Sequence, residues 1–447
     1  MRRPQAARLA LAALAVSFCL FAARFFLYHW AHSVDLLFWD QWDFYEAVFS
    51  PHSLWQQFRW QHGPTRMGLW VLVFHLVVAP SRWSTRAEVM AMCAIQALSC
   101  LGFLWLKRRL KAGWQASDCV VPCLFFTLVS YTTFLAIPNP AHGVLPLSLL
   151  IALALAWTIE SPRARLAAVV VVNLALVSTG FGFLAGFVVL PLLLWELRRA
   201  PGPAEARLQA LALAAALLSL VLFFAGYRFS PANDSFQWIH PRLWQYPAFA
   251  AVMAYRFAAV SRHPAWLLCG AAALAGVLAV LGADAAARLR GRPAPGLERR
   301  QAAVLLLLAG SSAAFAAAAA YGRVSLGLFE AGSSRYAVYL IPGAAALLLY
   351  LQLTARSRAR RALLAGLAVL AVASELQRPI PQDRAYADAL TAAKREWVRA
   401  YRSRPDADAA ARATGFYPHP RPAQTRLQQK LDQLQARRLS FFADPAR

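Results

Sequence analysis

Lysine and acidic residues are scarce in this chain of 447 residues. It contains four lysines, and its 46 Lys and Arg residues outnumber 21 Asp and Glu residues, which leaves a formal net charge of +25. Only 15% of the residues are charged, whereas 59% are hydrophobic. A soluble fold has no interior large enough to hide so much apolar side chain, so the composition excludes an ordinary soluble globular domain.

Extramembrane cysteine pairs, internal repeats and basic patches are missing as well. The six cysteines lie in or beside apolar blocks without histidine at metal-ligand spacing, so we expect them to form neither a disulfide nor a metal site. The absence of a repeat weighs against transporters built from two related halves. No basic patch with interleaved aromatic residues indicates nucleic-acid binding. The expected partners are therefore membrane lipids and no nucleic acid.

Apolar blocks near twenty residues long recur along the chain, and each is long enough to cross a bilayer as a helix. They predict an all-α polytopic membrane protein with about eleven transmembrane helices. The block 166–196 is too long for one helix, so the stretch Thr179–Gly182 is expected to turn it into a hairpin. The other expected spans are 9–28 (uncleaved), 87–106, 119–137, 141–159, 206–225, 265–283, 301–320, 336–354 and 362–376.

Two shorter blocks are expected to be amphipathic helices at the membrane interface. The block 67–79 ends at Pro80, and treating it as a span would put the next basic cluster on the wrong side of the membrane. We expect its Trp70 and His75, with Trp83, at headgroup level. The block 246–260 contains Arg256 and is flanked by further basic residues.

With these assignments, all six basic clusters fall on one side of the membrane, which the positive-inside rule makes the cytoplasmic side. Residues 1–377 then form a transmembrane domain with a cytoplasmic N-terminus and an outer loop at 29–86. The polar tail, residues 378–447, is expected to cap the outer, periplasmic face. We predict helices in it near Asp383–Arg402 and Ala423–Arg438.

The outer loop carries four carboxylates among aromatic residues between Asp35 and Glu46. A helix that begins near Asp40 would place Asp40 and Asp43 on one face, where they could converge on a hydroxyl group or a metal ion. Burial would raise the pKa of such a carboxyl group and make it a better base. The structural alternative is that Asp40 caps the helix, with Asp43 at its third position.

Basic side chains in two outer segments are candidates for binding a phosphate. His62 and Arg66 precede the interfacial helix at 67–79, although Arg66 could instead contact lipid headgroups. Arg323 and Arg335 lie on an outer loop against the prevailing charge bias, and Arg335–Tyr336 stands at the mouth of a span. The alternative for these arginines is an ion pair with Glu330.

This arrangement resembles the GT-C superfamily of membrane glycosyltransferases, in the branch with lipid A aminoarabinose transferases and protein O-mannosyltransferases. In that branch an acidic pair and a Tyr-containing helix open the first outer loop, as in Asp40-Gln41-Trp42-Asp43-Phe44-Tyr45. A Pro-containing stretch then precedes an interfacial helix, as in Gly63–Leu69. Gln41 replaces the second acid of the pair, and His62 stands near the place of a usual lysine.

The resemblance implies a polyprenyl-phosphate-linked sugar as donor, with a lipid, glycan or protein as acceptor. It implies a bacterial-type inner (plasma) membrane and an inverting transfer in which Asp40 or Asp43 acts as general base. The donor phosphate would be bound by His62, Arg66, Arg323, Arg335 and Tyr336. Whether the transfer uses a divalent cation is left open. The alternatives are a flippase or transporter for a lipid-linked saccharide and a non-catalytic membrane scaffold.

Overall fold

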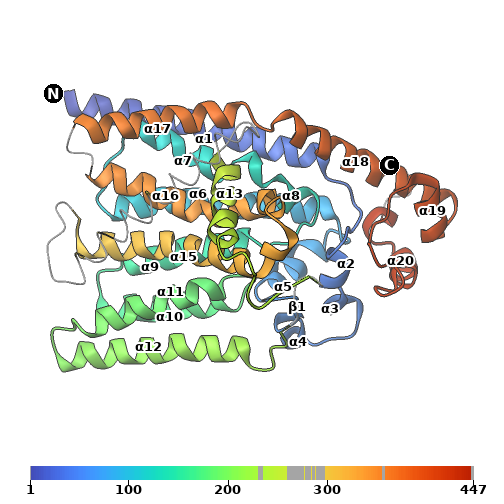
Figure 1. Cartoon of the computed structure of the whole chain (residues 1–447), viewed down its shortest axis with the longest axis horizontal. Helices are drawn as coiled ribbons and strands as arrows, with labels where there is room; N and C mark the ends of the chain where they lie inside the picture. Colours follow the sequence, from blue (N-terminus) through green and yellow to red (C-terminus); the bar gives the residue numbers. More distant parts are fainter. Residues whose placement is uncertain are drawn as a thin grey trace.

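The computed structural model describes residues 2–229, 235–258, 297–354 and 358–443, with the single positions 276, 283 and 287. Long helices lie side by side as a bundle, and short helices gather at one end of it (Figure 1). The expected span 265–283 and most of the basic cluster before Arg299 lie outside the described residues. In the described part, the only strands are a two-residue pair.

The long helices follow the apolar blocks. They are α1 (Arg2–His32), α6 (Thr85–Arg109), α9 (Val144–Trp157), α10 (Pro162–Val177), α11 (Phe183–Leu197), α12 (Pro203–Phe224), α13 (Gln245–Ala258), α15 (Arg299–Arg323), α16 (Ala337–Thr354), α17 (Arg358–Leu376) and α18 (Pro381–Ser403).

The short elements lie mainly in the segments between long helices. They are α2 (Gln41–Phe44), α3 (Glu46–Phe49), α4 (Leu54–Phe58), β1 (Gln61–His62), β2 (Thr65–Arg66), α5 (Trp70–Val73), η1 (Phe74–Val78), η2 (Ala116–Cys119), α7 (Val120–Phe125), η3 (Leu128–Ser130), α8 (Tyr131–Leu135), η4 (Val324–Leu326), η5 (Glu330–Gly332), η6 (Ser334–Tyr336), α19 (Ala407–Thr414), α20 (Leu427–Ala436) and η7 (Ser440–Phe442).

Seven helical stretches in the described residues are long and apolar enough to cross a membrane, which is the character of a multi-pass α-helical membrane protein. The count of eleven crossings stays a prediction. These stretches are Ala7–His32, Thr85–Arg109, Ala116–Leu135, Pro203–Phe224, Arg299–Leu326, Ser334–Thr354 and Arg361–Ser403.

The block 166–196 forms two helices, as predicted. The helix α10 ends at Val177 and α11 begins at Phe183, and Gly180 in the turn between them has a φ of +56°. The two helices and α9 have 14 to 16 residues each. At 1.5 Å per residue they measure roughly 21–24 Å, which is shorter than the ~30 Å hydrocarbon layer.

The basic clusters meet at one end of the bundle, which we call the basic end. There the side chain of Gln301, at the start of α15, donates to the carbonyl of Leu110, just after α6. Arg109 donates to the carbonyl of Thr158, which follows α9. The N-terminus lies at the same end (Figure 1). Which side of the membrane this end faces stays a prediction from the charge bias.

The loop 33–84 and the chain after α17 meet at the opposite end, which we call the loop end (Figure 1). Their apolar side chains form a shared core that is separate from the core of the bundle. It includes Trp42, Trp70 and Trp83 from the loop and Trp397 and Leu431 from the tail. The tail therefore folds onto the loop, and it contains α18 and α20 where two helices were predicted.

The expectation that Trp70 and Trp83 anchor the loop at headgroup level is wrong. Trp70 is fully buried and Trp83 is 7% exposed, because both pack in the loop–tail core. The segment 67–79 forms the short helix α5 and one π-helical stretch, too short to span. The helix α13 crosses the direction of the bundle (Figure 1), and its Arg256 pairs with Asp383 of α18.

Candidate active site

The four carboxylates between Asp35 and Glu46 have different surroundings. Asp35 accepts hydrogen bonds from the Ser84 hydroxyl and from the backbone N–H of Arg86, so it fastens the start of α6. Glu46 pairs with Lys430 at 2.8 Å and Arg426 at 2.5 Å, both from the tail. These two carboxylates serve the packing of the loop.

Asp43 is also engaged by the tail. Its carboxylate accepts a hydrogen bond from the Thr425 hydroxyl at 3.1 Å and lies 3.4 Å from Nε2 of His419. Partial burial raises the pKa of Asp43, but the hydrogen bond and charge of His419, the charge of His62 and the Thr425 hydroxyl lower it below its usual value. A carboxylate held in this way is a weak base.

Asp40 stands alone among the four. It occupies the position before α2, yet its side chain makes no capping hydrogen bond. Its carboxylate forms no hydrogen bond or ion pair with any residue in the described part of the chain. Its charge acts on His62 and on Arg323, which come from the hairpin β1–β2 and from the end of α15. The capping role that the sequence left open is therefore not realised.

Two histidines, His62 and His142, pack against the ring of Phe44. Burial lowers the pKa of His62, while the charges of Asp40 and Asp43 raise it. The ring of Phe44 lies edge-on between His62 and His142, with centroids 4.5 and 4.9 Å away. Nε2 of His142 lies 2.8 Å from the Thr65 hydroxyl, so the loop before α9 is joined to the hairpin.

His142 is kept neutral. Burial lowers its pKa from 6.5 to about 3, and the positive charges of His62, Arg323 and Arg335 act in the same direction. A neutral imidazole beside two guanidinium groups can donate or accept a hydrogen bond without adding charge to the site.

Arg323, Arg335 and Tyr336 meet around one carboxylate, that of Glu330. Glu330 pairs with Arg335, lies 3.8 Å from Nη1 of Arg323 and accepts a hydrogen bond from the Tyr336 hydroxyl at 3.3 Å. The arginines therefore do form the ion pair with Glu330 that the sequence left as an alternative. However, a single carboxylate is shared by two guanidinium groups. Nε of Arg335 is buried and has no hydrogen-bond partner among the described residues.

Arg66 lies elsewhere, contrary to the expectation that it binds the donor. Its guanidinium donates to the carbonyl oxygens of Phe223, Arg59 and Ala225 at 2.7, 2.7 and 2.9 Å. Two of those carbonyls belong to the end of α12 and the residue after it, which a helix leaves without partners of its own. Arg66 therefore joins the hairpin to α12, and each of its three guanidinium nitrogens already donates to a carbonyl oxygen.

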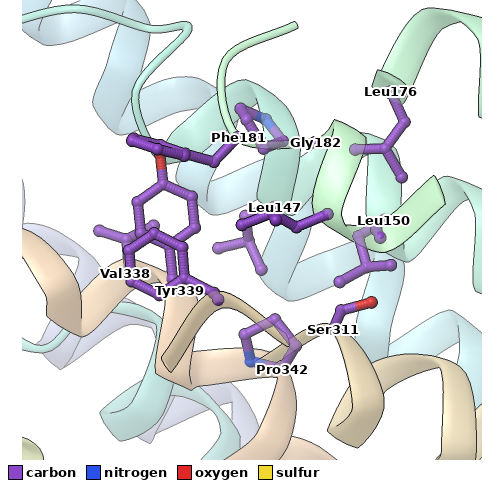
Figure 2. Close-up of a pocket in the computed structure, with 13 residues that line it drawn as sticks. Leu147, Leu150, Leu176, Phe181, Gly182, Ser311, Val338, Tyr339 and Pro342 are labelled. Atoms are coloured by element: carbon purple, nitrogen blue, oxygen red, sulfur yellow. The ribbon is translucent and has the colours of Figure 1, made fainter. Parts of the chain in front are cut away.

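An apolar cavity of about 30 Å³ lies on the bundle side of the polar residues, and Figure 2 shows its lining. Phe181 borders it, and the Phe181 ring lies 5.8 Å from that of His142. Tyr339, stacked on Phe315 at 3.8 Å, forms another wall. The Tyr339 hydroxyl points toward Phe181 (Figure 2), is buried, and has no hydrogen-bond partner among the described residues.

Sequence reasoning missed His142, Tyr339 and Glu88. Each lies inside or beside an apolar block that the sequence predicts only as a span. The signal was available, because a polar side chain within a predicted span is costly and often functional. Glu88 is fully buried and accepts hydrogen bonds from Tyr45 and Trp70.

The site residues that come together are Asp40, His62, Arg323, Arg335 and Tyr336. Among the described residues, no group of three His, Cys, Asp or Glu side chains is arranged to hold a metal ion. Comparison of the chain with protein-family models, with curated proteins and with solved structures finds no match. The site itself therefore carries the functional argument.

Proposed function

We propose that this chain is an inverting membrane glycosyltransferase that moves a sugar from a polyprenyl-phosphate carrier to an acceptor hydroxyl. The observation that carries the proposal is Asp40, the one carboxylate of the loop without a partner in the described residues, beside His62 and Arg323. In an inverting transfer a single general base is enough. Asp40, rather than the tail-bound Asp43, takes that role.

In the proposed reaction, the acceptor oxygen attacks the anomeric carbon from the face opposite the phosphate. The bond between the anomeric carbon and the phosphate oxygen breaks, and polyprenyl phosphate leaves with the bonding electrons. The acceptor proton passes to the Asp40 carboxylate. No further reactant is needed, and no covalent enzyme intermediate forms.

The charges around Asp40 suit this change. Arg323 and Arg335 carry two positive charges, and Glu330 and Asp40 carry two negative ones, so the group is neutral at rest. When Asp40 accepts the proton, the group gains one positive charge as the leaving phosphate gains negative charge. Preorganised charge of this kind is typically the largest contribution to catalysis.

Two hydrogen-bond donors without partners support a ligand at this place. Nε of Arg335 and the hydroxyl of Tyr339 are both buried and unpaired in the described part of the chain. Buried donors in native proteins nearly always have an acceptor. A phosphate oxygen would satisfy the Nε of Arg335, and a neutral His142 could bind a sugar hydroxyl.

The decisive experiment compares Asp40→Asn with Asp43→Asn in membranes that contain a polyprenyl-phosphate-linked, radiolabelled sugar and extracted envelope acceptors. We expect Asp40→Asn to lower the transfer rate by about 10²–10⁴-fold, the usual contribution of a general base. Asp43→Asn, a matched change three residues away, should keep most of the activity. Full transfer by Asp40→Asn would remove Asp40 as the base.

The same membranes separate the proposal from its alternatives. A flippase would move the labelled carrier across vesicles without forming a new glycosidic bond, and a scaffold would do neither.

A further inference from the structure

We propose that the basic end holds a second site, which binds a phosphate-bearing anion and is occupied in the membrane by an anionic phospholipid headgroup. A cavity of about 200 Å³ opens there, at the opposite end of the bundle from the short helix α2 (Figure 1). Its lining is Trp157, Arg165, Glu196, Glu205, Arg299 and Arg300. The inference does not depend on the proposed function.

Helix ends shape the electrostatics of this cavity. Three helices begin beside it: α10 at Pro162, α12 at Pro203 and α15 at Arg299. A helix start carries about half a positive charge and several unpaired N–H groups, both of which favour an anion. The start of α12 has no side-chain cap, because its capping residue is Gly202.

The side chains in the cavity carry one net positive charge. Arg299 lies 3.3 Å from Glu196, and Arg165 lies 3.8 Å from Glu205, so two cations face two anions. Arg300 is exposed and has no ion-pair partner among the described residues. A singly charged phosphodiester would balance the lining, and the guanidinium of Arg300 is suited to bind it in a bidentate manner.

A buried donor on α11, one residue before Glu196 of the lining, also lacks an acceptor. The indole of Trp195 lies between the guanidinium groups of Arg199 and Arg299, at 5.2 and 4.8 Å from its ring. Its Nε1 is buried without a hydrogen-bond partner in the described residues, whereas the Nε of Arg299 faces the Glu196 carboxylate at 3.3 Å. Buried donors nearly always have an acceptor, and the described residues supply none for this indole N–H.

A lipid fits better than free phosphate because the helices that line the cavity also expose apolar side chains. Leu194 of α11 and Leu211 of α12 are 38% and 67% exposed, and each lies on a helix that contributes to the lining. Acyl chains can cover these side chains while the headgroup reaches the arginines. Basic pockets between transmembrane helices bind anionic lipids in this way.

The test uses the purified full chain in detergent and measures thermal unfolding and bound lipid by native mass spectrometry. The ligands are phosphatidylglycerol, phosphatidylcholine and inorganic phosphate. We expect phosphatidylglycerol to stabilise the protein and to bind at least tenfold more tightly than phosphatidylcholine. Arg300→Gln should lower its affinity by about tenfold without unfolding the apoprotein, because Arg300 has no partner to lose in the described structure.

Arg163→Gln is the matched control, since Arg163 is exposed at the start of the same helix as Arg165 but does not line the cavity. It should leave the affinity for phosphatidylglycerol unchanged. A stabilisation by inorganic phosphate that Arg300→Gln abolishes would assign the site to free phosphate. Equal binding by the wild type and Arg300→Gln, or no preference for anionic lipid or phosphate, would overturn the proposal.

Discussion

The Tyr45 hydroxyl donates a hydrogen bond of 2.8 Å to the carboxylate of Glu88, and both residues are buried. Trp70 donates to the other carboxylate oxygen at 3.2 Å. Glu88 lies in the first turn of α6, whereas Tyr45 follows the helix that Asp40 opens. The buried carboxylate therefore fixes the position of the acidic loop on the bundle.

Replacing Glu88 by Leu removes the acceptor and leaves the Tyr45 hydroxyl and the Trp70 indole N–H unpaired. Each unpaired buried donor costs about 1–3 kcal/mol, so the free energy of unfolding should fall by several kcal/mol. Thermal unfolding in detergent measures the loss. Glu88→Gln keeps one acceptor oxygen and should lose less; equal losses would show that hydrogen bonding at Glu88 is not the cause.

Arg66 and Arg335 should respond in opposite ways to the same substitution. Arg66→Lys loses most of three hydrogen bonds to carbonyl oxygens, so we expect lower thermal stability and unchanged affinity for the lipid-linked donor in the folded fraction. Arg335→Lys should weaken donor binding with a smaller loss of stability. Donor titration and thermal unfolding of both variants give the comparison, and weaker donor binding in Arg66→Lys would contradict the structural role.

Local sequence was enough to predict most of the bundle, because the helices α6, α12, α15 and α16 follow apolar blocks within a few residues. The turn at Gly180 was also predictable. The apolar block has arginines at both ends, so both ends favour the same side of the membrane and the chain must turn back between them. The anchoring of the loop was not. In the sequence, Trp70 has the surroundings of a tryptophan at a membrane interface. In the structure it packs in a core that the tail helps to form, and that contact cannot be predicted from the residues around Trp70.

The roles of the site residues depend on contacts between distant parts of the chain. Asp40 and Asp43 are equivalent candidates in the sequence, and what separates them is His419, 376 residues beyond Asp43. Arg66 is a plausible phosphate ligand until its partners on α12, more than 150 residues away, are known. No spacing rule predicts such pairs, because they arise from tertiary packing.

His142 should make the stability of the protein depend on pH. Its pKa is lowered from 6.5 to about 3, so between these values the unfolded chain binds a proton that the folded protein does not. Stability from this group is complete above pH 6.5 and falls as the pH decreases, by at most about 1.4 kcal/mol per pH unit. Asp43 does not contribute to this change in stability, because its pKa is lowered from 3.8 and its stabilising effect is lost only below that pH.

The measurement is the midpoint of thermal unfolding between pH 7 and pH 5 for the wild type and for His142→Gln. The variant should lose part of the wild-type decrease in stability at low pH, with the remainder due to groups such as His62, whose pKa is also lowered. His75→Gln, the same substitution at an exposed position in η1, is the control and should keep the wild-type profile. Identical profiles for all three proteins would rule out His142 as the source.

Gly180 holds three parts of the site region together, and a methyl group there should separate them. Its N–H donates to the carbonyl of Arg66 at 2.8 Å, and a Cβ atom would lie 1.7 Å from the carbonyl oxygen of Ala141, next to His142. With the strain of a φ of +56°, Gly180→Ala should destabilise the turn and displace the loop that carries His142. We expect a lower unfolding temperature and a loss of transfer activity at temperatures where the variant is still folded. Gly113→Ala is the control, because it adds the same methyl group into open space and should change neither the unfolding temperature nor the activity. Wild-type activity in Gly180→Ala would show that the placement of His142 is irrelevant to transfer.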